Sequence, residues 1–293
     1  MKKLDILYIV VGLVIIYIGI VSFIYLSSAR YNDSISGKLI NQKPVLIDVI
    51  PKVIPGVVHI SCPQWQGSGF IVGPKHIITA RHIVEGVEDF IITTHSGCQV
   101  KATRALSSKA HDVAHIWIDD LTCIADIYDH NPEWANNRLF GLSHLAEVNP
   151  LKLGSIKDCK LGQEVFAIGS PYGKVNYNSV TLGIISGLDR NYDELNDGMY
   201  GSVDYGWDVA FQTDSPGHPG NSGGPIFTLD GKVRGVLVGG FSPSLIIAMP
   251  VDLFLDDIET IELMFLQDEY YHEEEIVYEY NQYGMPIGPG LGK

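Results

Sequence analysis

Basic residues are missing from the C-terminal part of the chain. No Lys or Arg lies between Gly235 and Gly292, whereas the same stretch holds eleven acids, and the 293-residue chain has a formal net charge of −14. Contacts to phosphates need basic patches, so the composition argues against nucleic acid as a partner. We expect residues 266–293 to form an acidic, flexible tail. Its role is either a solvated surface or an interaction and autoregulatory segment.

Cysteine is scarce, and its spacing excludes two classes of site. The chain has four cysteines and no Cys-x-x-Cys pair, which argues against a zinc ribbon and a thioredoxin-like motif. We expect no metal site. Disulfides are permitted outside the cytoplasm, and of the three connectivities we favour Cys62–Cys98 with Cys123–Cys159. Free buried cysteines are the alternative, because cysteine packs well as a small hydrophobe.

Charge is also absent from a long apolar segment near the N-terminus, residues 6–29. As a helix rising about 1.5 Å per residue, this segment is long enough to cross a bilayer. Lys2 and Lys3 precede it, so the positive-inside rule places residues 1–5 in the cytoplasm and the rest of the chain outside. We therefore expect a single-pass transmembrane signal anchor followed by a polar linker over residues 30–45. The alternative is a cleaved signal peptide and a secreted protein.

Short β-branched runs separated by turn residues recur through the middle of the chain, for example Ile116-Trp117-Ile118. Gly73-Pro74 and Asp230-Gly231 predict hairpin turns. Regular short strands with glycine turns indicate an all-β barrel or sandwich. Apolar residues at helical spacing over residues 251–265 predict one short C-terminal helix.

The residues with the clearest chemistry lie in Gly220-Asn221-Ser222-Gly223-Gly224-Pro225, which has the composition of a nucleophile turn. Its glycines allow a sharp bend and leave backbone N–H groups free to face a developing oxyanion. A serine nucleophile needs a base and an orienting acid. The candidates are His82, in Thr79-Ala80-Arg81-His82, and Asp112, in Asp112-Val113-Ala114. Asp119 and Asp120 compete for the acid role, but we expect them at the exposed end of a strand.

Four blocks in this order resemble the trypsin-like serine peptidases, and among them the HtrA/Deg-like branch. They are residues 67–72 with 78–82, residues 112–114, residues 165–173 with 180–187, and residues 212–225. The resemblance implies a chymotrypsin-like fold of two six-stranded Greek-key β-barrels, with a peptidase domain over residues 46–265. The first barrel is expected at about 46–150 and the second at about 151–250. No PDZ domain is recognisable after them, and residues 121–150 are expected to be an insertion.

The resemblance also implies the chemistry. Ser222 would attack a peptide carbonyl, His82 would take its proton, and Asp112 would stabilise the imidazolium, in the chain order His, Asp, Ser of the chymotrypsin arrangement. Gly220, Asn221 and Ser222 would supply the oxyanion hole, and no cofactor would be needed.

Substrate-binding residues are expected just before the nucleophile and on the strand after it. They are His218, Pro219, Val238, Gly239 and Gly240. None of residues 216–219 is acidic, so a Lys or Arg preference is not supported. A glycine-rich wall suits a small or medium apolar side chain at P1, the substrate residue before the cleaved bond. Extended substrates would pair as an added strand.

We therefore expect a membrane-anchored serine endopeptidase that acts on polypeptides in envelope protein quality control or processing. The alternative is a latent or inactive peptidase fold that serves as a peptide-binding chaperone or adaptor. Trimers are common among members of the family, so a homo-oligomer is also expected.

Overall fold

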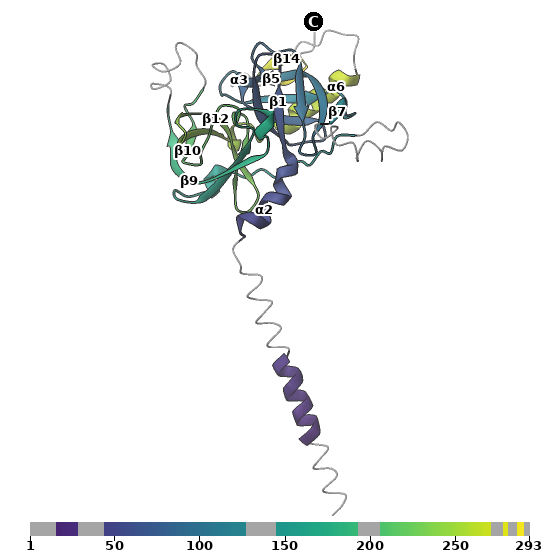
Figure 1. Cartoon of the computed structure of the whole chain (residues 1–293), viewed down its shortest axis with the longest axis vertical. Coiled ribbons are helices and arrows are strands. Elements are labelled where there is room, and N and C mark those ends of the chain that lie inside the picture. The colour runs from purple at the N-terminus through teal and green to yellow at the C-terminus, as the bar shows by residue number, and fades with distance from the viewer. Residues whose placement is uncertain are drawn as a thin grey trace, which may run out of the picture. The chain divides into compact units, whose positions relative to one another are not determined.

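The structure, a computed structural model, describes residues 16–28, 44–126, 145–192, 206–270, 278–280 and 286–289. The chain divides into two units, Met1–Pro44 and Val45–Lys293 (Figure 1).

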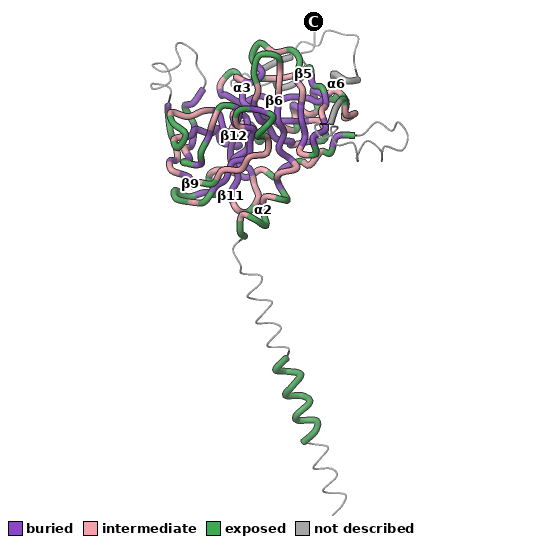
Figure 2. Tube along the Cα trace, in the orientation of Figure 1, coloured by how far each residue is buried: buried purple, intermediate pink, exposed green. Residues whose placement is uncertain are grey.

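The first unit contains one described helix, over residues 16–28, and its side chains are exposed (Figure 2). The predicted anchor over residues 6–29 is only partly described, because residues 6–15 and 29 lie outside the described ranges. Within those ranges, no helix combines the length and the apolar character needed to cross a membrane. Nearly all of the predicted linker over residues 30–45 also lies outside the described residues.

Six strands of the second unit close into a first barrel. Their order is β4-β1-β2-β3-β6-β5, and an additional pairing between β4 and β5 closes the ring. A short strand, β7, pairs with β5 at its edge. In chain order the elements are α2 (Leu46–Val53), η1 (Ile54–Gly56), β1 (Val57–Ser61), β2 (Gln66–Ile71), β3 (His76–Thr79), α3 (Arg81–Val84), β4 (Phe90–Thr93), β5 (Cys98–Ser107), β6 (Ala114–Ile118) and β7 (Ala125–Asp126).

The next six strands form a second closed barrel in the order β10-β13-β12-β11-β8-β9. Its elements are η2 (Ile156–Asp158), β8 (Glu164–Gly169), η3 (Lys174–Asn176), β9 (Ser179–Arg190), β10 (Ala210–Thr213), β11 (Pro225–Thr228), β12 (Val233–Ser242) and β13 (Leu245–Pro250). The prediction of an all-β chain with two six-stranded barrels is confirmed.

The strands form where β-branched and aromatic runs meet good turn residues. Gly73-Pro74 joins β2 to β3, and Asp230-Gly231 joins β11 to β12, where Gly231 has a φ of 76° that favours glycine. Buried residues gather in the strands of both barrels (Figure 2). In the second barrel, Phe166 and Phe227 are cross-strand partners whose rings stack with centroids 4.9 Å apart. Such pairs are what stabilise adjacent strands.

The C-terminal helix exists but begins later than predicted. Pro250 is followed by η4 (Val251–Leu253), and α6 spans Ile258–Tyr270. The helix packs on the first barrel, where Phe265 stacks on Trp117 with centroids 5.1 Å apart. The expected tail over residues 266–293 therefore starts inside α6. Its described segments β14 (Tyr278–Tyr280) and β15 (Pro286–Pro289) pair as a two-stranded sheet.

The predicted disulfide pairing is wrong. The structure joins Cys98 to Cys123, with Cα atoms 5.5 Å apart, and leaves Cys62 and Cys159 as free thiols. The chain that leads into β7 runs along the start of β5, where Cys98 lies. The N–H of Ile124 donates to the Gln99 oxygen at 2.8 Å, and this places Cys123 beside Cys98. Most of the predicted insertion at residues 121–150 lies outside the described residues.

Candidate active site

His82 and Asp112 meet at one end of the first barrel. The paired strands β3 and β6 bring them together: His82 lies in α3, directly after β3, and Asp112 lies just before β6. Asp112 is fully buried and accepts two hydrogen bonds from His82, one from Nδ1 at 2.7 Å and one from the backbone N–H at 3.0 Å. Because a carboxylate can only accept, Nδ1 carries the proton, and in the neutral ring Nε2 is the nitrogen that can accept one.

The electrostatics of this pair favour a basic imidazole. Burial by itself lowers the pKa of His82, but the negative charge of Asp112 and its hydrogen bond to the ring outweigh burial, so the pKa lies above its ordinary 6.5. The ring is not sealed off, since 26% of the side chain is exposed. An oriented, basic and accessible imidazole is what a general base requires.

The two competing carboxylates are engaged elsewhere. Asp119 accepts hydrogen bonds from the backbone and hydroxyl of Thr103, and Asp120 accepts from the backbone and hydroxyl of Thr122. Of the three candidate acids, Asp112 is the one at hydrogen-bond distance from His82.

Every carbonyl in the turn that carries Ser222 is held by a donor. The Pro219 oxygen accepts from the N–H of Tyr172 at 2.7 Å, and the Gly220 oxygen accepts from the hydroxyl of Ser68 at 2.7 Å. The oxygens of Asn221 and Ser222 accept from the N–H groups of residues 224 and 68 at 2.9 and 2.8 Å. Gly220 has a φ of 99°, which only glycine adopts without strain. The turn is therefore fixed at each of its four peptide units.

This pattern leaves two N–H groups of the turn without acceptors in the described part of the chain, those of Gly220 and Ser222. In a trans peptide the N–H points away from the preceding carbonyl. The N–H of Gly220 thus points away from Tyr172, whose N–H holds the Pro219 oxygen. The N–H of Ser222 likewise points away from Gly224, whose N–H holds the Asn221 oxygen. The N–H of Asn221 donates to the His218 oxygen at 2.9 Å, so including Asn221 as an oxyanion-hole donor is wrong.

The nucleophile turn packs directly on the segment that carries His82. A Cβ atom added at Gly67 would lie 2.8 Å from the side chain of Ile83 and 3.1 Å from the Ser222 oxygen. One added at Gly223 would lie 2.1 Å from the Thr79 hydroxyl. The turn of the second barrel that carries Ser222 and the segment of the first barrel that carries His82 therefore lie side by side.

A cleft of about 490 Å³ opens beside Ser222. Of the predicted substrate-binding residues, His218, Pro219, Gly239 and Gly240 line it, together with Tyr172, Gly217, Leu237, Phe241, Ser242, Pro243 and Ile246. Val238 does not line it, and its inclusion is wrong. Alternate residues of a strand face opposite sides, so Val238 is buried in the core, 3% exposed, while its neighbours face the cleft.

Two of the lining residues that sequence reasoning missed shape the cleft. Ile246 is the cross-strand partner of Gly240, and its side chain fills the space where a Cβ atom on either Gly217 or Gly240 would lie. The turn at Pro243-Ser244 predicts that β13 returns beside β12, but a register shift between Gly240 and Ser242 sets the pairing of Gly240 with Ile246. Tyr172 has a φ of 56°, unusual for a residue with a side chain, and its hydroxyl lies 3.2 Å from Nδ1 of His218 at the rim.

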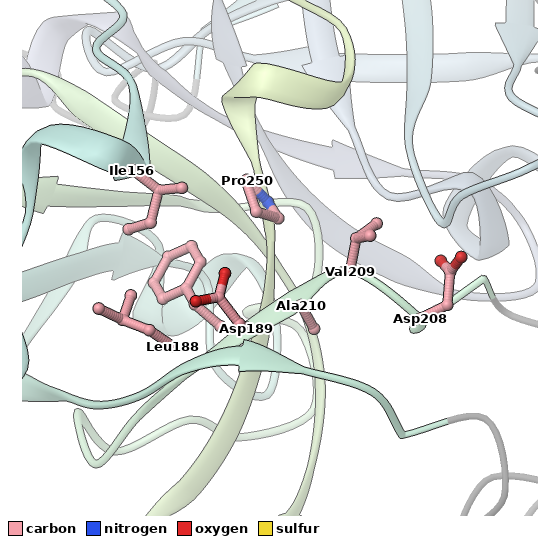
Figure 3. A pocket seen from close by; sticks show the side chains of 8 residues that line it. Ile156, Leu188, Asp189, Asp208, Val209, Ala210 and Pro250 are labelled. Carbon is pink, nitrogen blue, oxygen red and sulfur yellow. The ribbon is translucent and has the colours of Figure 1, made fainter.

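A smaller hollow of about 170 Å³ lies elsewhere on the second barrel (Figure 3). Two carboxylates, Asp189 and Asp208, are the charged groups around it, and the other lining residues are apolar: Ile156, Leu188, Val209, Ala210, Phe211 and Pro250. Its described lining contains no serine, cysteine or histidine. Ser222 and His218 line the larger cleft instead.

Comparison with known proteins gives one family. Residues 67–236 match the trypsin-like peptidase domain. A probable periplasmic serine endoprotease, DegP-like, from Halomonas elongata is 35% identical over 65% of this chain and 34% of its own length. The serine protease Do-like HtrA from Bacillus subtilis is 33% identical over 58% of this chain and 32% of its own length. The chain thus spans about a third of the length of these relatives.

Solved structures show the same fold. The HtrA-type protease AlgW with a tripeptide aligns with a TM-score of 0.55 at 20% identity, covering 82% of this chain and 70% of its own. Deg5 aligns with a TM-score of 0.51 at 25% identity, covering 72% and 90%.

Proposed function

Because the chain belongs to the family of trypsin-like peptidases, we propose that it is a serine endopeptidase that cleaves polypeptides through a covalent acyl-enzyme. The observation that supports this most directly is the bond of 2.7 Å between His82 Nδ1 and the buried carboxylate of Asp112. The segment that carries His82 packs on the turn that carries Ser222, and hydrogen bonds fix this turn with two of its N–H groups unused. These are the parts that acyl transfer requires.

The proposed reaction has two steps. In the first, the Oγ atom of Ser222 bonds to the substrate carbonyl carbon while its proton passes to Nε2 of His82. His82 then donates that proton to the amine as the peptide bond breaks. In the second, water attacks the acyl carbon, His82 takes a proton from the water, and returns it to Ser222 as the acid is released. Asp112 stays ionised and stabilises the imidazolium in both steps.

The two unused N–H groups of Gly220 and Ser222 would stabilise the negative charge on the carbonyl oxygen. Such donors act best when they need no reorganisation as charge develops. The hydrogen bonds that hold the four carbonyls of the turn also fix its backbone, so the two N–H groups need little reorganisation.

The cleft supports an apolar side chain at P1. Leu237 and Ile246 line it, and among its described lining residues there is no carboxylate to pair with a Lys or Arg. We extend the proposal to an extended substrate that pairs beside the cleft-lining edge of β12, as an added strand.

We also propose that residues 6–29 anchor the enzyme and that its peptidase domain works outside the cytoplasm on envelope proteins. Three observations support this: the uncharged apolar segment behind Lys2 and Lys3, the disulfide Cys98–Cys123, and the periplasmic relative from Halomonas elongata. Retention of the full chain in alkaline-washed membranes tests the anchor, and release into the wash would contradict it. Self-association stays a prediction.

Covalent labelling tests the proposed chemistry. A fluorophosphonate probe reacts with an activated serine, so the wild-type chain is expected to label while the Ser222→Ala and His82→Ala variants do not. Circular dichroism checks that all three are folded. A folded wild type that does not label would contradict the peptidase proposal and favour a latent fold that binds peptides.

A further inference from the structure

Ser68, at the start of the first barrel, is the hub of four hydrogen bonds around the nucleophile turn. It is fully buried in β2. Its hydroxyl bonds the Gly220 oxygen at 2.7 Å and accepts from the N–H of Ser170 at 2.9 Å. Its backbone N–H donates to the Ser222 oxygen at 2.8 Å, and its carbonyl accepts from the Thr79 hydroxyl at 2.7 Å.

The direction of the hydroxyl follows from its partners. A carbonyl can only accept, so Ser68 must donate its single proton to Gly220. The N–H of Ser170 can only donate, so it approaches a lone pair of the same oxygen and fixes the remaining orientation. The Ser68 hydroxyl is therefore a directed donor aimed at the Gly220 carbonyl.

That carbonyl belongs to the peptide unit between Gly220 and Asn221, which lies between the two units that carry the oxyanion donors. Glycine is the most freely rotating residue, and Gly220 lies between two carbonyls, its own and that of Pro219. The Pro219 carbonyl is held by the backbone N–H of Tyr172, which remains with every side chain except proline, whereas the Gly220 carbonyl is held by the side chain of Ser68. Without the hydroxyl, the peptide unit between Gly220 and Asn221 is held only through the bond from the Asn221 N–H to the His218 oxygen. The two neighbouring units, which carry the N–H groups of Gly220 and Ser222, are then free to turn relative to one another.

We propose that Ser68 is a positioning residue for the reaction: its hydroxyl holds the Gly220 carbonyl, and with it the peptide unit between the two oxyanion donors, so that the N–H groups of Gly220 and Ser222 stay aimed at one point. The inference rests on the proposed function, because a positioned oxyanion donor has a use only in acyl transfer. Ser68 does not touch the reacting atoms and acts through Gly220. It also joins the two barrels, so its role must be separated from a merely structural one.

Saturation kinetics of inactivation by a fluorophosphonate probe make this separation, using the full-length chain. The phosphoryl oxygen occupies the oxyanion position, so the maximal rate constant kinact reports on the positioned donors, and KI reports on initial binding. Loss of one oxyanion donor lowers turnover by about 100- to 1,000-fold. We expect Ser68→Ala to lower kinact by about 10- to 100-fold, since Gly220 still visits its productive position, with KI changed less than threefold.

Thr94→Val is the matched control. Thr94 is buried, 1% exposed, and its hydroxyl bonds the Cys98 oxygen at 3.3 Å, far in sequence from the nucleophile turn. This variant loses a buried hydroxyl without touching the turn, so kinact is expected to stay at the wild-type value. If Ser68→Ala does not fold, Ser68→Cys takes its place. A thiol is a weaker donor, so an intermediate kinact is expected.

Nitrogen-15 relaxation at the Gly220 and Asn221 amides supplies a readout that is independent of catalysis. Both amides are expected to be rigid in the wild type and in Thr94→Val, and mobile in Ser68→Ala. An unchanged kinact, or a weaker KI at constant kinact, would overturn the proposal. If the wild type does not react at all, the peptidase function fails, and the role of Ser68 is judged by the relaxation at Gly220 alone.

Discussion

Acid should destabilise the protein through a buried pair of histidines. His76 in β3 and His115 in β6 are both completely buried, with Nε2 of His76 at 2.8 Å from Nδ1 of His115. Aromatic rings surround the pair, with Trp117 and Phe265 near His76 and Phe254 near His115. A charged imidazolium in this apolar setting would lack the hydration it has in the unfolded chain.

The size of the effect follows from the pKa of His76. Burial lowers that pKa from 6.5 to about 4. Above pH 6.5 His76 is neutral in both the folded and the unfolded chain. Between pH 6.5 and about 4, the unfolded chain binds a proton that the folded chain does not, so stability is lost as the pH falls through this window. At about 1.4 kcal/mol per pKa unit, the loss that His76 causes is about 3 kcal/mol.

The perturbation that isolates this contribution is His76→Gln, because the glutamine amide can still donate to Nδ1 of His115 but does not titrate. The free energy of unfolding is measured by urea titration, with tryptophan fluorescence, at several pH values between 4 and 7. Burial and the charge of His76 also lower the pKa of His115, and the part due to burial persists in the variant. The wild type is therefore expected to lose about 3 kcal/mol more than the variant across this range.

His218→Gln is the matched control, because His218 lies at the rim of the cleft and not in the core. Its pH dependence is expected to follow the wild type. Equal slopes for the wild type and His76→Gln would refute the reasoning, since they would mean that burial of His76 does not exclude its proton.

Three further predictions concern the site and the fold. The pH profile of fluorophosphonate inactivation should have a midpoint above 6.5, because His82 must be neutral to act as a base and Asp112 raises its pKa. In Asp112→Asn the midpoint should fall to a lower pH. An unmoved midpoint would contradict this account. Cys98→Ser, which breaks a disulfide between residues 25 apart, should lower the free energy of unfolding by about 2–4 kcal/mol in urea titrations without reductant. Gly223→Ala should lower the free energy of unfolding by about 2–5 kcal/mol, because its φ is 84° and its Cβ would lie 2.1 Å from a backbone oxygen of β2. Gly86→Ala, with a φ of 69° and open space around it, should lower it by about 1–2 kcal/mol. Equal losses in the two variants would refute the steric argument.

Much of the fold was predictable because its cues are local. Alternating β-branched runs and good turn residues such as Gly73-Pro74 specify strands and hairpins over a few neighbours. The candidate base and acid were also predictable, because His82 and Asp112 each lie in a short, recognisable block. The structure brings their side chains to hydrogen-bond distance.

The details that the sequence missed depend on partners far apart in the chain. Which cysteine forms the disulfide with Cys98 depends on how the chain at β7 pairs with β5, and neither segment alone specifies that register. Val238 was assigned to the cleft together with Gly239 and Gly240 on the strand after the nucleophile, but the pleat turns its side chain to the core. Tyr172 reaches the cleft because a loop after β8 returns to the nucleophile turn and adopts a left-handed backbone there.

By itself, the amino-acid sequence determined the class of fold, where short strands and hairpin turns occur along the chain, and the apolar segment at residues 6–29. It also determined the identity of the candidate nucleophile, base and acid. These properties arise from residue types and their spacing along the chain. Only the tertiary structure decided which amides of the nucleophile turn are free, what lines the cleft, and that Ser68 holds the Gly220 carbonyl. A hydrogen bond between residues 152 positions apart depends on how two closed barrels pack, and no local pattern encodes that.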